Sequence, residues 1–569
     1  MTAGAVALAS VAGPGLFGAD AKLASDGLVK ELIDANDRDI PTILKLQNRT
    51  AGHRWFGGQM SEYGFPTPGG TSGVVSALAC ALTTRGSRFF ESAELVEPLR
   101  LAVAYLLVAQ HDEDGTVDYY ATNFHSAPDV AFILEVLSPP SLLLRQSKVA
   151  ALGPIAADLG KFITRAADGL VTAGIHTPNH RWVACAALAW ANALFPNPKY
   201  VGRIDQWLAE TIDIDPDGQY TEKSTTVYSP IVDRALIVVA HLLKRPELLE
   251  PVRRNLEMTL FYIHPDGEVV TEASRRQDRY RRGSMARYYF AYRSMALEDR
   301  NGRFAAMTRE IERSARSQLR GELSTFLSDP AFGRDLPPDE ALPTDYAKFF
   351  AYSSLARIRR GTSSGTILAG NTTLFSFRKG SAALEAVRFA SAFFGKGQFS
   401  GESLDVQGNR YRMRQELEGP YFQPLNKEQI AHGDHARMAP NGTLANDSRA
   451  LRVKSNIQTL VSDVEITERK GVFKIVFSIL GTADVPVAIE LAFRHGGKLQ
   501  GVEPIEHVGG AYLLKTGTGR YVSEGDTIEF GPGQVEHTYT QVRGAVPKWD
   551  GQSVYLTGLT PFKFELTVG

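Results

Sequence analysis

The chain has 569 residues, of which 43% are hydrophobic and 22% charged, the composition of an ordinary globular protein with more than one domain. The 62 basic and 63 acidic residues leave a net charge of −1, which argues against a general nucleic-acid-binding protein. Two cysteines, Cys80 and Cys185, are too few for a disulfide-stapled scaffold or a cysteine-rich zinc module.

Residues 1–23 are a candidate export signal or leader. Residues 2–19 are uncharged and rich in Ala, Val, Leu and Gly, and Ala19-Asp20-Ala21 resembles a small-residue cleavage site. We therefore expect a secreted or periplasmic protein. Since no later stretch reaches the roughly 18–20 uninterrupted apolar residues of a membrane span, we expect no integral membrane segment.

Residues 24–360 carry apolar side chains at helical spacing, and Pro and Gly residues interrupt them at the spacing of helix pairs. The pattern predicts helices around six apolar runs: Val75–Leu82, Leu99–Val108, Val130–Leu137, Trp182–Leu194, Ala235–Leu243 and Met285–Met295.

A weak internal repeat runs through this half. Asp-Gly turns occur at Asp114-Gly115, Asp217-Gly218 and Asp266-Gly267. The first two are about two units of fifty residues apart, and the last two are about one unit apart. Fifty residues suit one helical hairpin with its loops, and such hairpins bury their apolar faces only by stacking or by closing into a ring. We predict an (α/α) toroid in which the polar residues after these turns gather at one end, although Asp-Gly is also simply a common turn pair.

Residues 361–569 show short alternating runs separated by turn residues. This pattern predicts an antiparallel β-sandwich domain. The predicted strands include Thr373–Phe377, Ala386–Ala392, Thr459–Ile466, Val472–Ile479 and Val487–Phe493.

Polar residues that follow the turns are candidate substrate contacts. Asn123 and His125 stand just before a predicted helix, and five arginines lie between positions 275 and 282. Arginine suits planar carboxylates, so Arg275, Arg276 and Arg279 are candidate anion contacts. A solvated helix face is the alternative explanation of such a charge run.

The triplet Asn179-His180-Arg181 is the most specific feature. Pro178 favours a helix start, and the apolar run from Trp182 continues the helix. Helix N-termini attract negative charge through free N–H groups and the macrodipole, so the triplet predicts a carboxylate site. The alternative is that Asn179 caps the helix and His180 packs under the next turn.

These residue types suit proton abstraction next to a carboxylate. Neutralising the carboxylate with Asn, His or Arg stabilises the charge that develops during the reaction. A tyrosine, with an ordinary pKa of about 10, can then remove or deliver the proton. This reaction is β-elimination from a uronic acid, and it requires no redox cofactor.

The stretch from Asp217 to Tyr228 reads Asp-Gly-x-x-x-Glu-x-Ser-x-x-x-Tyr. Together with the Asn-His pair and the order of toroid and sandwich, it resembles the heparinase II/III type of polysaccharide lyase, related to alginate and chondroitin lyases. The resemblance implies that Asn179 and His180 neutralise the substrate carboxylate. It implies that Tyr228 is the catalytic acid and a candidate for the base, and Glu222 is a candidate substrate contact.

One departure concerns metals. Such lyases often carry a histidine-containing stretch at the start of the sandwich that supplies a base or a metal site, but residues 395–402 contain no histidine. His432 and His435 are weak substitutes, because zinc accepts histidine and aspartate ligands but loop histidines are more often simple polar residues. We expect no required cofactor, with a divalent metal as the alternative.

Three aromatic residues, Trp55, Tyr63 and Tyr421, stand in loop-like surroundings. Aromatic rings stack on the C–H faces of sugars, so these residues are candidate contacts for an acidic polysaccharide or oligosaccharide. Ordinary packing beneath loops is the alternative.

Two other functions fit the same sequence. A glycoside hydrolase on a helical toroid needs two carboxylates roughly 5–10 Å apart. A non-catalytic protein that binds acidic glycans would use the arginines and aromatic residues for adhesion alone. The carboxylates available for hydrolysis are Asp215, Asp217, Glu222, Glu272 and Asp278.

Overall fold

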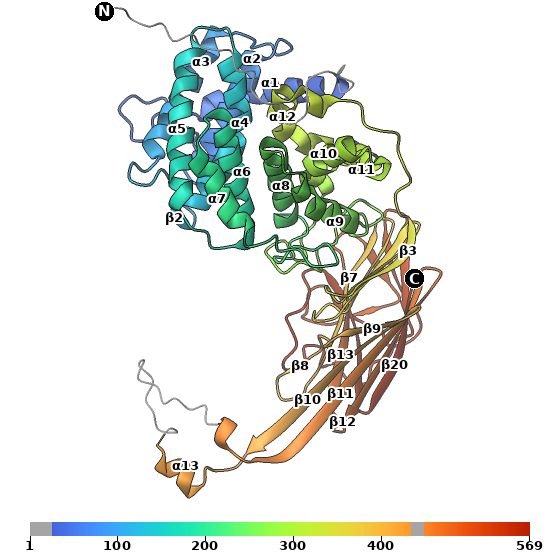
Figure 1. The fold of residues 1–569 in the computed structure, drawn as a ribbon. Coiled ribbons are helices and arrows are strands. Elements are labelled where there is room, and N and C mark those ends of the chain that lie inside the picture. The colour runs from blue at the N-terminus through green and yellow to red at the C-terminus, as the bar shows by residue number, and fades with distance from the viewer. Residues whose placement is uncertain (1–25, 434–448) are drawn as a thin grey trace, which may run out of the picture. The chain divides into compact units, whose positions relative to one another are not determined.

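A computed structural model describes residues 26–433 and 449–569, so the candidate export signal and His435 lie outside the described residues. The chain divides into two compact units. The helical unit contains the described residues up to Ile263 together with Gly267–Leu342, and the β unit contains His264–Asp266 and Pro343–Gly569. Figure 1 shows helices throughout the first unit and mostly strands in the second.

The helices of the first unit form two layers. The inner helices α2, α4, α6, α8 and α10 contact one another in that order, and the outer helices α3, α5 and α7 do the same (Figure 1). The short helix α12 contacts α2, and η4 contacts both α12 and α10, so the inner row closes into the predicted toroid. The bounds are α1 Asp26–Leu46, α2 Pro68–Thr83, α3 Ala93–Ala109, α4 Ala127–Gln146, α5 Leu152–Thr172, α6 Pro178–Leu194, α7 Pro198–Leu208, α8 Tyr228–Leu243, η1 Pro246–Leu248, α9 Leu249–Thr259, η2 Met285–Tyr288, α10 Tyr289–Asp299, α11 Gly302–Ser314, η3 Arg316–Glu322, α12 Leu323–Ser328 and η4 Pro330–Gly333.

Residue type explains which layer each helix joins. In α6 every residue from Trp182 to Ala191 is buried, and most of them are alanines or other apolar residues that allow neighbouring helices to approach from all sides. In the outer helix α7 only Tyr200 and Ile204 are buried, because its remaining face meets solvent. The six apolar runs read from the sequence all fall inside these helices or the η2–α10 segment.

The Asp-Gly repeat has a structural counterpart. The turns at 114–115, 217–218 and 266–267 lie inside short antiparallel bridges, Gln110 to Val117, Ile214 to Tyr220 and Ile263 to Val269. Each turn glycine has a positive φ, a conformation that glycine adopts without strain. A fourth bridge, Gln47 to Gln59, lacks the Asp-Gly signature and was therefore not predicted from the sequence.

An amide side chain secures three of these turns. Gln47 Nε2 donates to the carbonyl oxygen of Gly57 at 3.1 Å, and Gln110 Nε2 donates to that of Gly115 at 2.9 Å. Asn255 Nδ2 donates to the carbonyl oxygen of Gly218 at 2.8 Å. Because all three amides are buried, each hydrogen bond fixes its turn against the helix that carries the amide or that ends just before it.

Among the described residues, α4 is the helix whose length and composition would allow it to cross a membrane. Of its most apolar window, 67% is buried inside the structure.

Two sheets form the β unit. One has the order β14-β17-β18-β20-β12-β11-β10-β9, the other has the order β15-β16-β19-β13-β7-β6-β5-β4-β3, and β8 pairs with β7. Neighbouring strands are antiparallel except β16 and β19. The bounds are β3 Asp345–Phe350, β4 Leu355–Arg360, β5 Ser363–Leu368, β6 Phe375–Lys379, β7 Ala382–Ser391, β8 Gly397–Gln398, β9 Leu404–Gln407, β10 Arg410–Phe422, β11 Lys454–Arg469, β12 Val472–Gly481, β13 Pro486–Phe493, β14 Lys498–Gln500, β15 Glu503–Pro504, β16 Ala511–Leu513, β17 Gly519–Ser523, β18 Asp526–Gly531, β19 Gln552–Leu559 and β20 Phe562–Val568.

The two sheets face each other across an aromatic core, as the sandwich prediction requires. Phe375 of one sheet lies 4.8 Å from Phe473 of the other, and Phe389 lies 5.4 Å from Phe477, both measured between ring centroids. The five predicted strands correspond to β6, β7, β11, β12 and β13.

The division between the units falls earlier than the predicted boundary at 360/361. The structure places it between Leu342 and Pro343, so β3 and β4 belong to the larger sheet. The boundary was predicted too late because neither strand shows the expected alternation of apolar residues. β3 is a mostly exposed edge strand, and β4 is rich in arginine. Arg357 of β4 is nevertheless fully buried, and its Nη1 donates to Thr366 Oγ1 at 2.5 Å.

Gly218→Ala tests the turn geometry. A Cβ atom there would lie 2.5 Å from the carbonyl oxygen of Arg254, and the backbone has a φ of +95°. We expect the free energy of unfolding to fall by roughly 1–3 kcal/mol, measured by denaturant titration of the helical circular dichroism signal. The control is Gly202→Ala on the exposed face of α7, where a Cβ meets nothing within 4 Å and should stabilise by about 0.5–1 kcal/mol. Equal effects at both positions would contradict the assigned turn.

Candidate active site

The loops that lead from outer to inner helices contact one another at one end of the helical unit. The loop before α8 contacts the start of α6 through Glu222 and Asn179. The loop before η2 contacts the loop before α8 twice, since Arg275 N donates to the Lys223 carbonyl oxygen and Thr226 N donates to Asp278 Oδ2. The polar residues after the second and third turns are therefore brought together.

Asn179 lies in the first turn of α6 and is 1% exposed. Its backbone N–H donates to Glu222 Oε1 at 3.1 Å, and its side-chain Nδ2 donates to the same oxygen at 2.7 Å and to Thr177 Oγ1 at 3.1 Å. The Asn179 amide thus faces the protein interior. A carboxylate does bind at this helix N-terminus, but it is the protein's own Glu222.

Tyr228 opens α8 and lies beside the arginine-rich loop. The guanidinium carbon of Arg276 lies 5.2 Å from the centre of the Tyr228 ring, and Gln277 Nε2 donates to Tyr228 Oη at 2.7 Å. Arg276 Nε also lies 3.9 Å from Glu222 Oε2. Gln277 was not among the predicted site residues, although it stands within the arginine-rich stretch whose arginines were predicted to contact anions.

His180 follows Asn179 and packs edge-to-face against His176 and Phe132, at ring distances of 4.9 and 6.1 Å. Burial is the largest cause that lowers its pKa, to about 4, and the neighbouring His176 and Arg276 lower it further, whereas Asp129 opposes them. The imidazole is therefore neutral at pH 7, so it can donate or accept a hydrogen bond but supplies no positive charge.

The β1–β2 hairpin, Val117–Tyr119 paired with Asn123–Ser126, holds Asn123 and His125. Asn123 Nδ2 donates to Asp129 Oδ2 at 3.1 Å, and His125 Nδ1 lies 2.8 Å from Asp114 Oδ2. The hairpin and the loop before α6 line an open pocket of about 570 Å³, whose walls include Asn123, His125 and His176.

The contacts of the other candidate cations are with residues other than Tyr228. Arg181 Nη1 lies 3.0 Å from Glu210 Oε2 and its Nη2 lies 2.9 Å from Asp213 Oδ1, so Arg181 ties α6 to the loop before α8. The Arg279 guanidinium lies over the ring of Tyr280 at 4.8 Å. Arg275 is exposed.

The aromatic candidates fall in two places. In the helical unit, Trp55 is half-buried under Arg54 at 4.2 Å, and Tyr63, 75% exposed, stacks on Phe65. In the β unit, Tyr421 is 60% exposed. His432 is also exposed, in the β unit just after α13, Lys427–Ala431.

Three of the carboxylates that a glycoside hydrolase could use accept hydrogen bonds from the protein itself. Glu222 accepts hydrogen bonds from Asn179, and Asp278 Oδ2 accepts one from the Thr226 hydroxyl at 2.9 Å. Both side chains are buried. Asp215 Oδ1 accepts from the Gln219 N–H inside its own turn. The Tyr228 phenol beside the Arg276 guanidinium is an arrangement that suits proton transfer next to a bound anion.

No family model and no curated protein sequence matches this chain. Solved structures do. A chondroitin AC lyase from Streptomyces coelicolor A3 in complex with chondroitin sulphate aligns over 97% of this chain and 80% of its own, at 12% identity and a TM-score of 0.51. A Paenibacillus xanthan lyase aligns over 97% of this chain and 58% of its own, at 10% identity and a TM-score of 0.57. At these identities the likeness establishes the shared fold of helical toroid and β-sandwich.

The buried position of His180 predicts its titration. Its ¹³C-labelled imidazole resonance should titrate near pH 4, well below the pKa of 6.5 of an ordinary histidine, because burial disfavours the charged ring. The measurement is a heteronuclear NMR titration, and the signal is assigned by its loss in His180→Gln. A midpoint at or above 6.5 would contradict the described environment.

Proposed function

We propose that this protein is a polysaccharide or oligosaccharide lyase of heparinase II/III type that cleaves uronic-acid-containing glycans by β-elimination. The observation that carries the proposal is the placement of the Tyr228 phenol at the start of α8, with Arg276 over its ring and Gln277 on its oxygen. The shared fold with chondroitin AC lyase and xanthan lyase supports it.

In this proposal Tyr228 is the catalytic acid and base. Tyr228 enters the reaction as the phenolate, removes the proton from the sugar carbon next to the carboxylate and so becomes the phenol. A carbon–carbon double bond forms, and the bond to the leaving oxygen breaks with its electron pair on that oxygen. The leaving oxygen then takes a proton from the same phenol. Gln277 donates to Oη and so holds the phenol in place without using its proton.

Arg276 and His180 are the groups we assign to the substrate carboxylate. The Arg276 side chain is 36% exposed and can pair with an incoming carboxylate on its open side. His180 contributes a hydrogen bond from a neutral ring. Asn179 has a different role from the one its motif implies. Its amide is engaged by Glu222, so it positions the first turn of α6 beside the substrate.

The remaining sequence candidates belong to the outer subsites of this proposal. Asn123 at the pocket, and Trp55 and Tyr63 on the loop before α2, would contact sugar rings further along the chain. Export from the cytoplasm, read from residues 1–23, accords with an extracellular polysaccharide substrate.

Tyr228→Phe tests the central role. Because the variant lacks the phenolic proton, we expect turnover to fall by about 10²–10⁴-fold with little change in binding. Turnover is measured as ultraviolet absorbance of the unsaturated product on a panel of chondroitin sulphate, xanthan and alginate. Tyr200→Phe is the matched control, since it removes the same hydroxyl from a hydrogen bond to Asp168 on the outer helices and should leave turnover intact.

The product decides between the three functions. Unsaturated non-reducing ends support the lyase, saturated non-reducing ends support the hydrolase, and binding without any product supports the glycan-binding protein. Full turnover in Tyr228→Phe would refute the proposed acid and base.

Arg276→Gln tests the carboxylate contact. Loss of one charge-assisted pair should lower kcat/KM by at least ten-fold on a uronic-acid substrate, a change of about 1.4 kcal/mol in transition-state stabilisation. The control is Arg313→Gln on α11, an exposed arginine paired with Glu310 one turn away. If both variants keep the wild-type kcat/KM, another group binds the carboxylate.

A further inference from the structure

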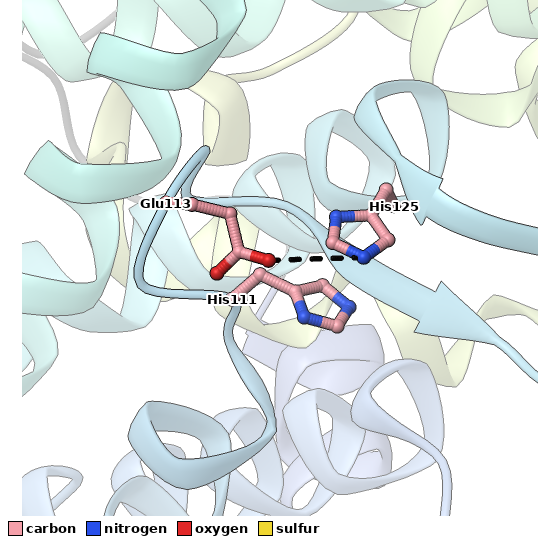
Figure 2. A group of neighbouring side chains, drawn as sticks. All are labelled: His111, Glu113 and His125. Atoms are coloured by element: carbon pink, nitrogen blue, oxygen red, sulfur yellow. Dashed lines mark ion pairs between the residues drawn. The ribbon is translucent and has the colours of Figure 1, made fainter.

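A cluster of metal-ligand side chains lies at the base of the β1–β2 hairpin and takes no part in the elimination proposed above. His111 and Glu113 precede β1, and His125 lies in β2 (Figure 2). One donor atom from each of the three lies within 4.8 Å of the others. His125 Nε2 lies 3.9 Å from Glu113 Oε1, and the two imidazole rings stack at 3.7 Å with planes 12° apart.

Carboxylates hold both imidazole rings from outside the cluster. Asp114 Oδ2 lies 2.8 Å from Nδ1 of His125, which leaves Nε2 facing Glu113. Asp118 Oδ1 lies 2.8 Å from Nε2 of His111 and also accepts the backbone N–H of His125 at 2.9 Å. A carboxylate on the other nitrogen of a ligating imidazole is the usual outer contact of metal-bound histidine, because it fixes the ring orientation and raises ligand basicity.

The backbone at His125 is held in an uncommon conformation. Its φ is +47°, a region that residues other than glycine rarely adopt and that costs about 1–3 kcal/mol where it persists. The contacts of His125 with Asp118 and Asp114 hold the residue there, and its side chain is thereby directed toward His111 and Glu113.

We propose that His111, Glu113 and His125 bind one divalent transition-metal ion, with zinc as the best match to two imidazoles and one carboxylate. Zinc binds these ligands at about 2.0–2.2 Å, so two donors of one ion are at most about 4.4 Å apart. The His125–Glu113 pair already meets this limit. The remaining donor pairs lie within 4.8 Å. Binding therefore needs a small movement of the 67% exposed Glu113 side chain and a rotation of one imidazole out of the ring stack, which turns its in-plane lone pair toward the ion. Calcium and magnesium prefer all-oxygen sites.

The ion would tie the residues before β1 to β2 and so close the hairpin. This hairpin carries Asn123 and forms one wall of the 570 Å³ pocket opposite the loop with His176. Because Glu113 and His125 are exposed, the fourth coordination position stays open to water. The inference concerns metal binding itself and does not depend on the lyase reaction.

The test is zinc titration of the full chain, free of any polyhistidine tag and stripped of metal, in competition with a chromophoric chelator. We expect wild type to bind an ion that His125→Gln and Glu113→Gln each bind at least ten-fold more weakly. Zinc should also raise the melting temperature of wild type but not of His125→Gln. Glu113→Gln alters an exposed side chain, so its weaker binding cannot be attributed to misfolding.

His432→Gln is the matched control, since it removes an exposed histidine of the β unit and should bind zinc as wild type does. The proposal is overturned if wild type binds no zinc, if His125→Gln and Glu113→Gln keep the wild-type affinity, or if His432→Gln loses the ion equally.

Discussion

The hydrogen bonds between the Glu222 carboxylate and Asn179 are the interaction on which the candidate site depends. One oxygen of Glu222 accepts hydrogen bonds from both the backbone N–H and the side-chain amide of Asn179. Both residues are buried, so losing either hydrogen bond would leave a buried polar group unpaired and lower the stability. Negative charge at a helix N-terminus is favourable, so the pair fixes the loop before α8 to the start of α6. Tyr228 follows Glu222 closely in sequence, and its position at the start of α8 is set by the same anchor.

The toroid explains why so many polar residues converge. Each loop from an outer to an inner helix ends where an inner helix begins, and the inner helices contact one another around the ring. Buried amides such as Gln110 and Asn255 hold the turns in these loops rigidly. Side chains that are remote in sequence, such as Tyr228 and Gln277, therefore meet at hydrogen-bond distance, which is the positional accuracy that a functional site needs.

Two groups of polar side chains lie in these loops, one at Tyr228 and one at the β1–β2 hairpin. At Tyr228, the neighbouring Arg276 guanidinium suits an anionic group. On the β1–β2 hairpin, histidines backed by carboxylates suit a metal ion. Both arrangements depend on burial or on outer contacts that no single residue reveals, which is why motif spacing alone describes neither of them fully.

The sequence by itself determined the two architectures and the chemical character of the loops. Apolar periodicity reports burial directly, so the helices around Trp182–Leu194 and the strands around Val472–Ile479 follow from it. Only the tertiary structure decided where each polar group points. It turned Asn179 inward to Glu222, paired Arg181 with Glu210 and Asp213, and buried Arg357 in a strand that the sequence pattern assigned to the helical half. A side chain's partner is fixed by packing between segments distant in the chain, and local pattern carries no information about those contacts.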